Sequence, residues 1–365
     1  MTRQVYAKGV VFLLVILACL QVARGQESSR VPLRLDRAIP VSGLQGAGMI
    51  SPLKCDNAGN IYVRFDHPRV YAAPVVKITP DGEKKAIFSL DAAKDWEEGE
   101  FYDFAVQPDG SLYLLAARRG KGREIEHAIL SFNEEGKYRL AIPLKVPITS
   151  LNQLTVFQSG EFLVVGSNKV KEASSGGPDG NQAQSSKAPE VAARILVLSR
   201  NGDILREVFL SDDLEIVPEG QSGKKQHLIM PVGAVSLGRS VPGDNGEIFL
   251  KFRTSTTAVY ALLPKSETIR RIDIPPPSKE SQALNIWFAS GTGLVVQFAE
   301  KGPGRSFNTA LSVISIVDPQ TGERRYDYQV TADIGGVFAC YAPKGLLFLW
   351  TDQEGRLNLR RAVPR

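Results

Sequence analysis

The chain has 365 residues, 43% of them hydrophobic, with 44 Lys and Arg against 39 Asp and Glu. Nucleic-acid binding needs a concentrated basic face, and none is visible in this sequence. Three cysteines without CxxC or Cys/His spacing exclude a disulfide scaffold and a zinc site of that kind.

Residues 1–25 have the pattern of a secretory signal peptide. Arg3 and Lys8 precede an apolar run at 10–20 that is too short to span a bilayer. Ala23-Arg24-Gly25 then fits the small-x-small cleavage rule. We therefore expect a secreted or periplasmic mature chain, 26–365, without a transmembrane segment.

Lipoprotein processing at Cys19 is an alternative for the same segment, although Leu17 is atypical two residues before such a cysteine. The segment also carries most of the net charge of +5. Without Arg3, Lys8 and Arg24, the chain has 41 basic residues against 39 acidic ones.

A short motif, a turn followed by an apolar β-prone run, occurs six times. The copies begin at Gly59, Gly110, Gly160, Gly246, Thr292 and Lys344. They start 51, 50, 86, 46 and 52 residues apart, and a period of roughly 40–50 residues is typical of a β-propeller with four strands per blade. The sequence therefore predicts one all-β domain, a six-bladed β-propeller, rather than the two domains that length alone suggests.

β-branched and aromatic residues predict four antiparallel strands in each of the first five blades. The predicted ranges are 49–55, 61–65, 75–79 and 84–90 in blade 1; 101–107, 112–117, 128–132 and 138–144 in blade 2; 151–157, 162–166, 194–199 and 204–210 in blade 3; 232–237, 248–252, 258–263 and 268–274 in blade 4; and 283–289, 294–298, 311–317 and 324–330 in blade 5.

Blade 6 has only three predicted strands before the sequence ends: 337–341, 346–350 and 357–362. Residues 31–36 supply the fourth, and Pro32 suits an outermost strand because proline is largely confined to sheet edges. This N-terminal strand would close the ring. The glycine-rich segment 43–48 is predicted to be the turn that leads into blade 1.

Tight turns with Gly or Asn join most first to second and third to fourth strands, so the longer loops share the opposite face, the long-loop face. Function on a rigid scaffold usually lies on such loops. Residues 169–192 are rich in Ser, Gly, Ala, Gln and Lys and are predicted to be a disordered insertion in blade 3. Residues 211–230 form a second long loop.

Cys55 and Cys340 lie at the same register, each four residues before its copy of the motif. Ring closure makes the first and last blades neighbours, so a disulfide outside the cytoplasm is one expectation. Two buried thiols are the alternative, because apolar residues such as Val106 and Val156 occupy the matching positions.

The phrase CDNAGNIYV at 55–63, followed by VKITPDG at 76–82, resembles the repeat of NHL and TolB-like six-bladed propellers. PDGSLY at 108–113 matches that repeat again. The resemblance implies the fold and leaves the function open, because the group contains binding scaffolds, envelope proteins and a few enzymes.

The residue seven positions before the start of a copy is polar in three of the six copies: Asp103, Gln153 and Asn285. Pro52 and Val337 occupy this position in two other copies, and Ala234 is the expected match in blade 4. Side chains alternate along a strand, so Asp103, Gln153 and Asn285 are expected to share one orientation near the channel mouth.

This set resembles the divalent-metal site that gluconolactonase/regucalcin-type propellers build from Glu, Asn and Asp. The resemblance implies Ca²⁺ or another divalent cation on Asp103, Gln153 and Asn285. The departure is that only one carboxylate is aligned, whereas a hard cation prefers more charge. The alternative is a polar channel lining bridged by water.

The other candidate ligand-binding residues are expected at the channel mouth or on the long-loop face: Lys54, His67, Trp96 and His127. His227 lies in the loop before blade 4, and solvated loop residues are the simpler interpretation of all three histidines. The acidic segment 95–100 contains Trp96, and a basic segment follows at 118–123. These are either solvated loops or a partner surface with Trp96 as an apolar anchor.

No GxSxG, HExxH or P-loop motif occurs. A rigid ring with varied loops indicates a monomeric, non-catalytic binding or scaffold module that needs no cofactor and engages a protein, peptide or glycan. The alternative is a metal-dependent lactonase or esterase-like hydrolase with the cation at the channel mouth.

Overall fold

The computed structural model describes residues 30–45, 48–120, 122, 124–169, 190–210, 229–254, 256–300 and 311–365. The predicted signal peptide, Cys19, His227 and most of the two long loops lie outside the described residues. Within these ranges, no helix combines the length and apolar character that crossing a membrane requires.

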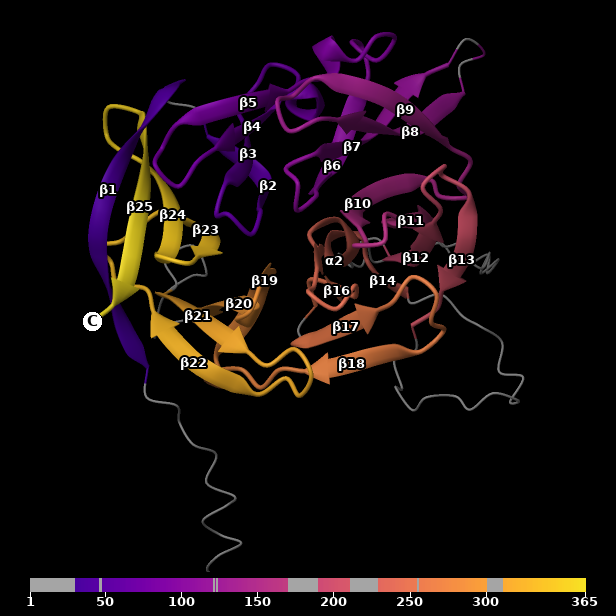
Figure 1. Ribbon diagram of the computed structural model, residues 1–365. Helices are drawn as coiled ribbons and strands as arrows, with labels where there is room; N and C mark the ends of the chain where they lie inside the picture. Colours follow the sequence, from indigo (N-terminus) through magenta and orange to yellow (C-terminus); the bar gives the residue numbers. More distant parts are fainter. Residues whose placement is uncertain are drawn as a thin grey trace, which may run out of the picture.

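The described residues form an all-β fold in which twisted sheets stand around a central axis, a propeller-like arrangement (Figure 1). Four of these sheets are separate, each with its first strand nearest the axis (Figure 1). The first consists of β2 (Met49–Cys55), β3 (Ile61–Phe65), β4 (Val75–Ile78) and β5 (Lys84–Phe88), and the second of β6 (Glu100–Val106), β7 (Leu112–Arg119), β8 (Ile125–Phe132) and β9 (Tyr138–Leu144). The third has five strands: β10 (Ser150–Val156), β11 (Phe162–Lys169), β12 (Glu190–Leu198), β13 (Ile204–Val208) and β14 (Ile229–Pro231), which pairs with β12. The fourth consists of β15 (Arg239–Pro242), β16 (Ile248–Lys251), β17 (Ala258–Leu262) and β18 (Ile269–Asp273).

A fifth sheet contains eight strands. In sheet order they are β19 (Ser281–Ala289), β20 (Gly293–Glu300), β21 (Leu311–Val317), β22 (Arg324–Gln329), β1 (Val31–Gln45), β25 (Arg356–Pro364), β24 (Gly345–Thr351) and β23 (Val337–Ala342). The parallel contact between β1 and β22 covers only Val31 opposite Tyr328 and Pro32 opposite Gln329. The predicted six separate blades are thus found only in part, because the last seven strands and β1 form one continuous sheet.

The N-terminal strand β1 pairs with the C-terminal strand β25, as the sequence predicts. It is longer than the predicted 31–36, because pairing continues to Gln45 opposite Arg356. The segment predicted as a turn at 43–48 is therefore partly strand. Since the two ends of the described chain pair with each other, ring closure couples sequence-distant segments.

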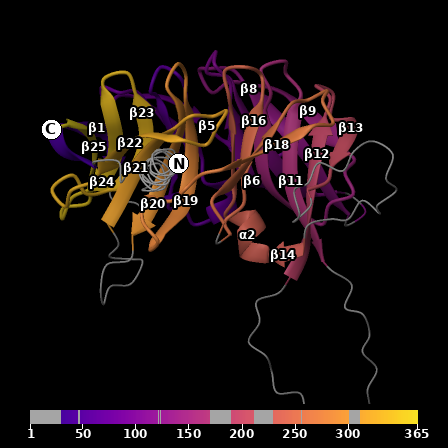
Figure 2. The same cartoon turned by 90° about the horizontal axis from the view of Figure 1, so that it is seen from below.

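Blade 4 corrects one predicted strand. Residues 232–237 are not an inner strand: Val232–Ser236 form the short helix α2, and the inner strand is β15. The adjacent residues Ala234 and Val235 are both buried while Val232 and Leu237 are exposed, a spacing that suits a helix better than a strand. Strand β14 (Ile229–Pro231) precedes α2 and pairs with β12, and Figure 2 shows both projecting on one side of the ring.

The ends of the segment 169–192, predicted as a disordered insertion, are strand, and residues 170–189 lie outside the described residues. Strand β11 continues to Lys169 and β12 begins at Glu190, and the two pair directly from Lys169 opposite Val191. Two single-turn 3-10 helices, η1 (Val70–Ala72) and η2 (Leu90–Ala92), lie in other connections.

The hydrophobic core lies between neighbouring sheets rather than within one sheet. Phe88 of β5 packs in one cluster with Phe101 of β6 and Phe132 of β8, all fully buried. The second strand of a sheet is covered on both faces, so consecutive residues such as Ile61, Tyr62 and Val63 are all buried. This packing holds the innermost strand of each sheet in place around the axis.

The glycines that open four of the motif copies have the backbone conformation that the turns require. Their φ angles are 80° at Gly59, 81° at Gly110, 95° at Gly160 and 79° at Gly246. Residues with a Cβ rarely adopt this region, so glycine sets the tight turn between first and second strands.

Cys55 of β2 and Cys340 of β23 form a disulfide, with their Cα atoms 5.9 Å apart. The bond joins two inner strands whose residues are 285 positions apart in the sequence. It therefore links the first sheet covalently to the C-terminal end of the eight-stranded sheet.

Candidate functional site

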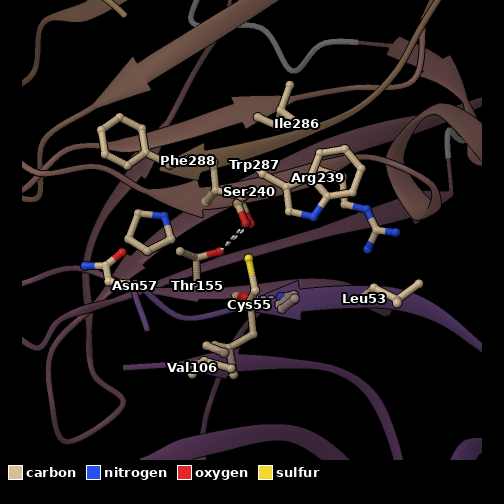
Figure 3. Close-up of a pocket in the computed structure, with 15 residues that line it drawn as sticks. Leu53, Cys55, Asn57, Val106, Thr155, Arg239, Ser240, Ile286, Trp287 and Phe288 are labelled. Atoms are coloured by element: carbon tan, nitrogen blue, oxygen red, sulfur yellow. Dashed lines mark hydrogen bonds between the residues drawn. The ribbon is translucent and has the colours of Figure 1, made fainter. Parts of the chain in front are cut away.

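Residues of the inner strands line two adjacent cavities, here called the mouth cavity and the inner cavity. The mouth cavity lies beside the end of α2 and is lined by Asp103, Gln153 and Leu237, among others. The inner cavity is lined by Leu53, Thr155, Trp287 and Phe288, among others (Figure 3). The two cavities share three residues: Lys54, Arg239 and Ser240. Their empty volumes, open solvent included, are about 460 Å³ and 620 Å³.

A β-bulge immediately precedes each of the three polar residues that the sequence singled out. The pairing register shifts between Phe101 and Asp103, between Leu151 and Gln153, and between Ala283 and Asn285. A bulge turns the following side chain to a new direction and often lies next to a functional site. The recurrence in three sheets gives these residues equivalent positions on their inner strands.

Asp103 is buried and already paired. Its Oδ2 atom accepts from Lys54 Nζ at 2.9 Å and from the backbone N–H of Leu154 at 2.8 Å. Lys54 Nζ also donates to the backbone oxygens of Phe104 and Leu154. Lys54, predicted only as a ligand-binding residue, therefore ties three inner strands together through Asp103.

Gln153 holds α2 against the channel wall. Its Nε2 atom donates to the backbone oxygen of Val235 at 2.9 Å. A Cβ atom on Gly238 would lie 2.5 Å from Gln153 Nε2 and 2.9 Å from the Lys251 oxygen, so only glycine fits between helix and strand. Gln153 Oε1 has no hydrogen-bond partner among the described residues.

Asn285 is brought to the site by a residue that the sequence reading missed. Arg239 Nε donates to Asn285 Oδ1 at 3.2 Å. Arg239 lies seven residues before Gly246, the same register as Asp103 and Gln153, so the repeat itself carried the signal. The expected match, Ala234, was wrong because residues 232–236 form a helix.

Among the described residues at the site, three cations act on a single carboxylate. Lys54, Arg64 and Arg239 act on one another and on one carboxylate, Asp103. Burial lowers the pKa of Lys54 and Arg64, and it lowers that of Arg239 to about 10, while Asp103 opposes each shift. A divalent cation on Asp103 would have to displace Lys54 and approach two arginines, so this charge distribution disfavours the predicted metal ligands. In the described parts of the chain, no three His, Cys, Asp or Glu side chains are placed to hold a metal.

The chain has a propeller-like all-β fold. No family model matches it, and no curated protein matches its sequence. Among solved structures, it resembles a protein of unknown function from Bacteroides caccae at 15% identity, with 84% of this chain and 96% of that one covered and a TM-score of 0.45. It also resembles a DUF4221 family member from Bacteroides vulgatus at 11% identity, with 93% and 99% covered and a TM-score of 0.48. A third similar structure is a GH74 xyloglucanase from Xanthomonas campestris at 16% identity, with 84% and 48% covered and a TM-score of 0.39. At these values the likeness carries no argument about function.

The remaining predicted site residues lie away from these two cavities. His67 is exposed, with its Nδ1 3.0 Å from the backbone oxygen of Arg69. His127 lies half-buried in β8, where burial lowers its pKa. Trp96 is buried in the core with the Arg118 guanidinium 4.6 Å above its ring, so the prediction that Trp96 is an exposed anchor is wrong. His227, Lys121 and Arg123 lie outside the described residues.

Lys251 lies opposite Arg239 in the β15–β16 pair and is 2% exposed. Its Nζ donates to the backbone oxygen of Phe252 at 2.8 Å. Burial, with a smaller contribution from Arg253, lowers the pKa of Lys251 to about 8. The native state therefore binds fewer protons here than the unfolded state between about pH 8 and 10.5, so in that window this group makes stability rise with pH.

Replacing Lys251 by Met is expected to raise the free energy of unfolding at neutral pH by about 1 to 3 kcal/mol, because the removal of a buried charge outweighs the cost of leaving the Phe252 carbonyl without this donor. The gain should shrink as the pH rises from about 8 and disappear above 10.5, where the wild-type lysine becomes neutral in both states. Urea unfolding of wild type and variant at several pH values measures the difference. Lys85→Met, at an exposed position of β5, is the control and should change little. A pH-independent difference would contradict the assignment.

Proposed function

We propose that this protein is a non-catalytic binding module whose channel mouth and long-loop face hold a protein, peptide or glycan ligand. The observation that carries the proposal is the meeting of the two cavities at Lys54 and Arg239, inside a rigid ring of packed inner strands. Asp103 is engaged by Lys54 and a backbone N–H, so its role is to hold charge and position rather than to transfer a proton. Neither nucleic acid nor a resident cofactor is part of the proposal.

We infer that the ring has six blades of the NHL/TolB-like kind. The eight-stranded sheet divides into two antiparallel groups of four, β19–β22 and β23–β25 with β1, joined by a contact of two residue pairs. A hydrophobic cluster packs between these two groups, as similar clusters pack between the other neighbouring sheets. The long β1 strand thus acts as the closing strand of a sixth blade.

The proposed compartment is extracytoplasmic, with residues 1–25 as a cleaved signal peptide, and the proposed state is a monomer. The Cys55–Cys340 disulfide supports such a compartment, because cytosolic thiols are kept reduced. Anchoring through Cys19 is the alternative route to the same compartment.

The test uses peptide and glycan arrays with three forms of the purified protein: wild type, Arg239→Gln and Arg271→Gln. Arg271 lies on β18, the outer strand of the sheet that carries Arg239 on its inner strand, so its variant makes the same charge change away from the channel. We expect a ligand class that wild type and Arg271→Gln bind and that Arg239→Gln binds about tenfold more weakly. Equal binding by Arg239→Gln would place the site elsewhere, and no binding by any form would contradict the proposal.

The metal-dependent hydrolase remains a second candidate because of one observation. Asp103 Oδ1 and Gln153 Oε1 are buried and have no hydrogen-bond partner among the described residues. A thermal melt after EDTA treatment, repeated with Ca²⁺, Mg²⁺ or Zn²⁺, separates the candidates, since saturation at 100 times the dissociation constant stabilises by about 2.7 kcal/mol. We expect no metal-dependent shift. A shift that Asp103→Asn abolishes would favour the hydrolase.

A further inference from the structure

The mouth cavity contains hydrogen-bond acceptors that the fold itself does not use. Asp103 Oδ1, Asn152 Oδ1 and Gln153 Oε1, here called the mouth acceptors, are buried and have no hydrogen-bond partner among the described residues. All three residues line the mouth cavity. A buried acceptor without a partner costs about 1 to 3 kcal/mol, which a bound donor would recover. The mouth acceptors therefore favour a ligand that brings hydrogen-bond donors.

Neighbouring contacts fix which atoms of Asp103 and Gln153 remain available. Gln153 Nε2 donates to the Val235 oxygen at 2.9 Å, so the other end of this amide is the acceptor oxygen. Asp103 uses Oδ2 for Lys54 Nζ and for the backbone N–H of Leu154, which leaves Oδ1. The contacts that position these two side chains are thus separate from the oxygens that a ligand would use.

Two β-bulges bring consecutive side chains to the same cavity. Tyr102 and Asp103 of β6 both line the mouth cavity, and so do Asn152 and Gln153 of β10. Consecutive side chains of a regular strand lie on opposite faces of the sheet. Here the pairing register shifts, and Tyr102 and Asn152 are the extra residues of the two bulges. Each bulge therefore presents two side chains to the mouth where a regular strand presents one.

Apolar side chains accompany the mouth acceptors. The ring centroids of Tyr102 and Tyr71 lie 5.9 Å apart in an edge arrangement. Tyr71 belongs to η1 and is 52% exposed, whereas Tyr102 is half-buried. Leu237, which also lines the mouth cavity, is exposed as well. A ligand with both donors and an apolar face would cover this combination of surfaces.

Lys54 restricts the kind of donor that suits the cavity. Its ammonium lies 2.9 Å from Asp103 Oδ2, and both residues line the mouth cavity. A second cation on Oδ1 of the same carboxylate would lie close to this ammonium, and like charges side by side cost free energy. A hydroxyl group donates without that cost. Sugars carry hydroxyl groups on adjacent carbons, and the C–H groups of a sugar ring can pack against the negative face of an aromatic ring.

We propose that the mouth cavity binds a neutral sugar unit, whose hydroxyl groups donate to the mouth acceptors and whose ring packs against Tyr102. This inference rests on the proposed binding function and selects glycans from the three ligand classes named there. The sugar unit is the part of the glycan that enters the channel.

The test is calorimetric titration of the purified protein with the methyl glycosides of glucose, galactose, mannose and N-acetylglucosamine. The controls are deoxyfluoro analogues in which fluorine replaces one hydroxyl group at a time, which keeps the size of the sugar but removes one donor. We expect at least one glycoside to bind, and fluorine at one or more of its positions to weaken binding about tenfold. Methyl glucosaminide, with an ammonium in place of one hydroxyl, should bind more weakly than methyl glucoside.

Three variants locate the binding. Asn152→Leu keeps the size of the side chain but removes one mouth acceptor, and it should weaken glycoside binding severalfold. Gln153→Met should weaken it about tenfold. Asn358→Leu is the control, because β23 and β24 separate its strand, β25, from the axis, and it should bind as wild type does. Asn152→Leu keeps the proposal testable if loss of the Gln153–Val235 bond prevents Gln153→Met from folding.

Glycoside binding that fluorine weakens at no position, or that neither Asn152→Leu nor Gln153→Met weakens, would overturn the inference. Tighter binding of methyl glucosaminide would also overturn it, because the favoured donor would then be a cation. The array experiment distinguishes this failure from failure of the proposed function. If array peptides bind and depend on Arg239 but no glycoside binds, the binding function stands and the sugar class is wrong. If neither array ligands nor glycosides bind, both are wrong.

Discussion

Replacing Asp103 by Asn is expected to lower the free energy of unfolding by about 3 to 5 kcal/mol, because it leaves buried cations without their counter-charge. The side chain of Asp103 is 6% exposed and that of its partner Lys54 is 15% exposed, so water cannot replace the lost carboxylate. Asparagine keeps the size of the side chain and one acceptor oxygen, so the loss measures charge rather than packing. Urea unfolding at neutral pH measures it.

Two comparisons make this result specific. The double variant Asp103→Asn with Lys54→Met should recover much of the loss, since it removes the stranded ammonium as well. Asp273→Asn breaks an exposed ion pair with Arg271 and should change stability by less than about 1 kcal/mol. If Asp103→Asn and Asp273→Asn lose similar amounts of stability, the buried pair contributes no more to stability than the exposed one.

Removal of the disulfide is the second change with a large expected effect. Replacing Cys55 and Cys340 together by Ala should lower the free energy of unfolding by about 2 to 5 kcal/mol, because the bond closes a segment of 285 residues and restricts the unfolded chain. Thermal melts with and without reductant measure the effect. Wild type should lose stability in reductant to the level of the double variant.

The double variant itself should not respond to reductant, which provides the control. If wild type shows the same melting temperature with and without reductant while the reduced form is verified by mass, the closure bond contributes nothing to stability. In that case the β1–β25 pairing alone would hold the ends together.

Local periodicity explains why so much of the fold was predictable. Glycine turns followed by apolar runs recur at nearly constant spacing, and each such unit forms its hairpins from neighbouring residues. The N-terminal strand was also predictable, because the last blade had only three predicted strands and residues 31–36 could supply the fourth. The continuous eight-stranded sheet was not, because the contact between β1 and β22 depends on how two groups of strands meet.

Only some of the site residues could be predicted from the sequence. Asp103, Gln153 and Asn285 were found because they share a register with the repeat. Arg239 shares it as well, but the apolar run at 232–237 looked like an inner strand and moved the expected match to Ala234. Trp96 failed for a different reason: an aromatic residue among acidic ones looks exposed, yet it packs into the core under Arg118.

The sequence by itself determined the strands, their grouping by a repeated turn and the register that places polar residues on the inner strands, because these follow from short-range backbone preferences. The tertiary structure decided which charges meet. Lys54, Arg64, Asp103 and Arg239 come from three sheets, and the ring brings them close enough to interact electrostatically. Electrostatic interaction depends on distance through space and on burial, neither of which a linear pattern contains.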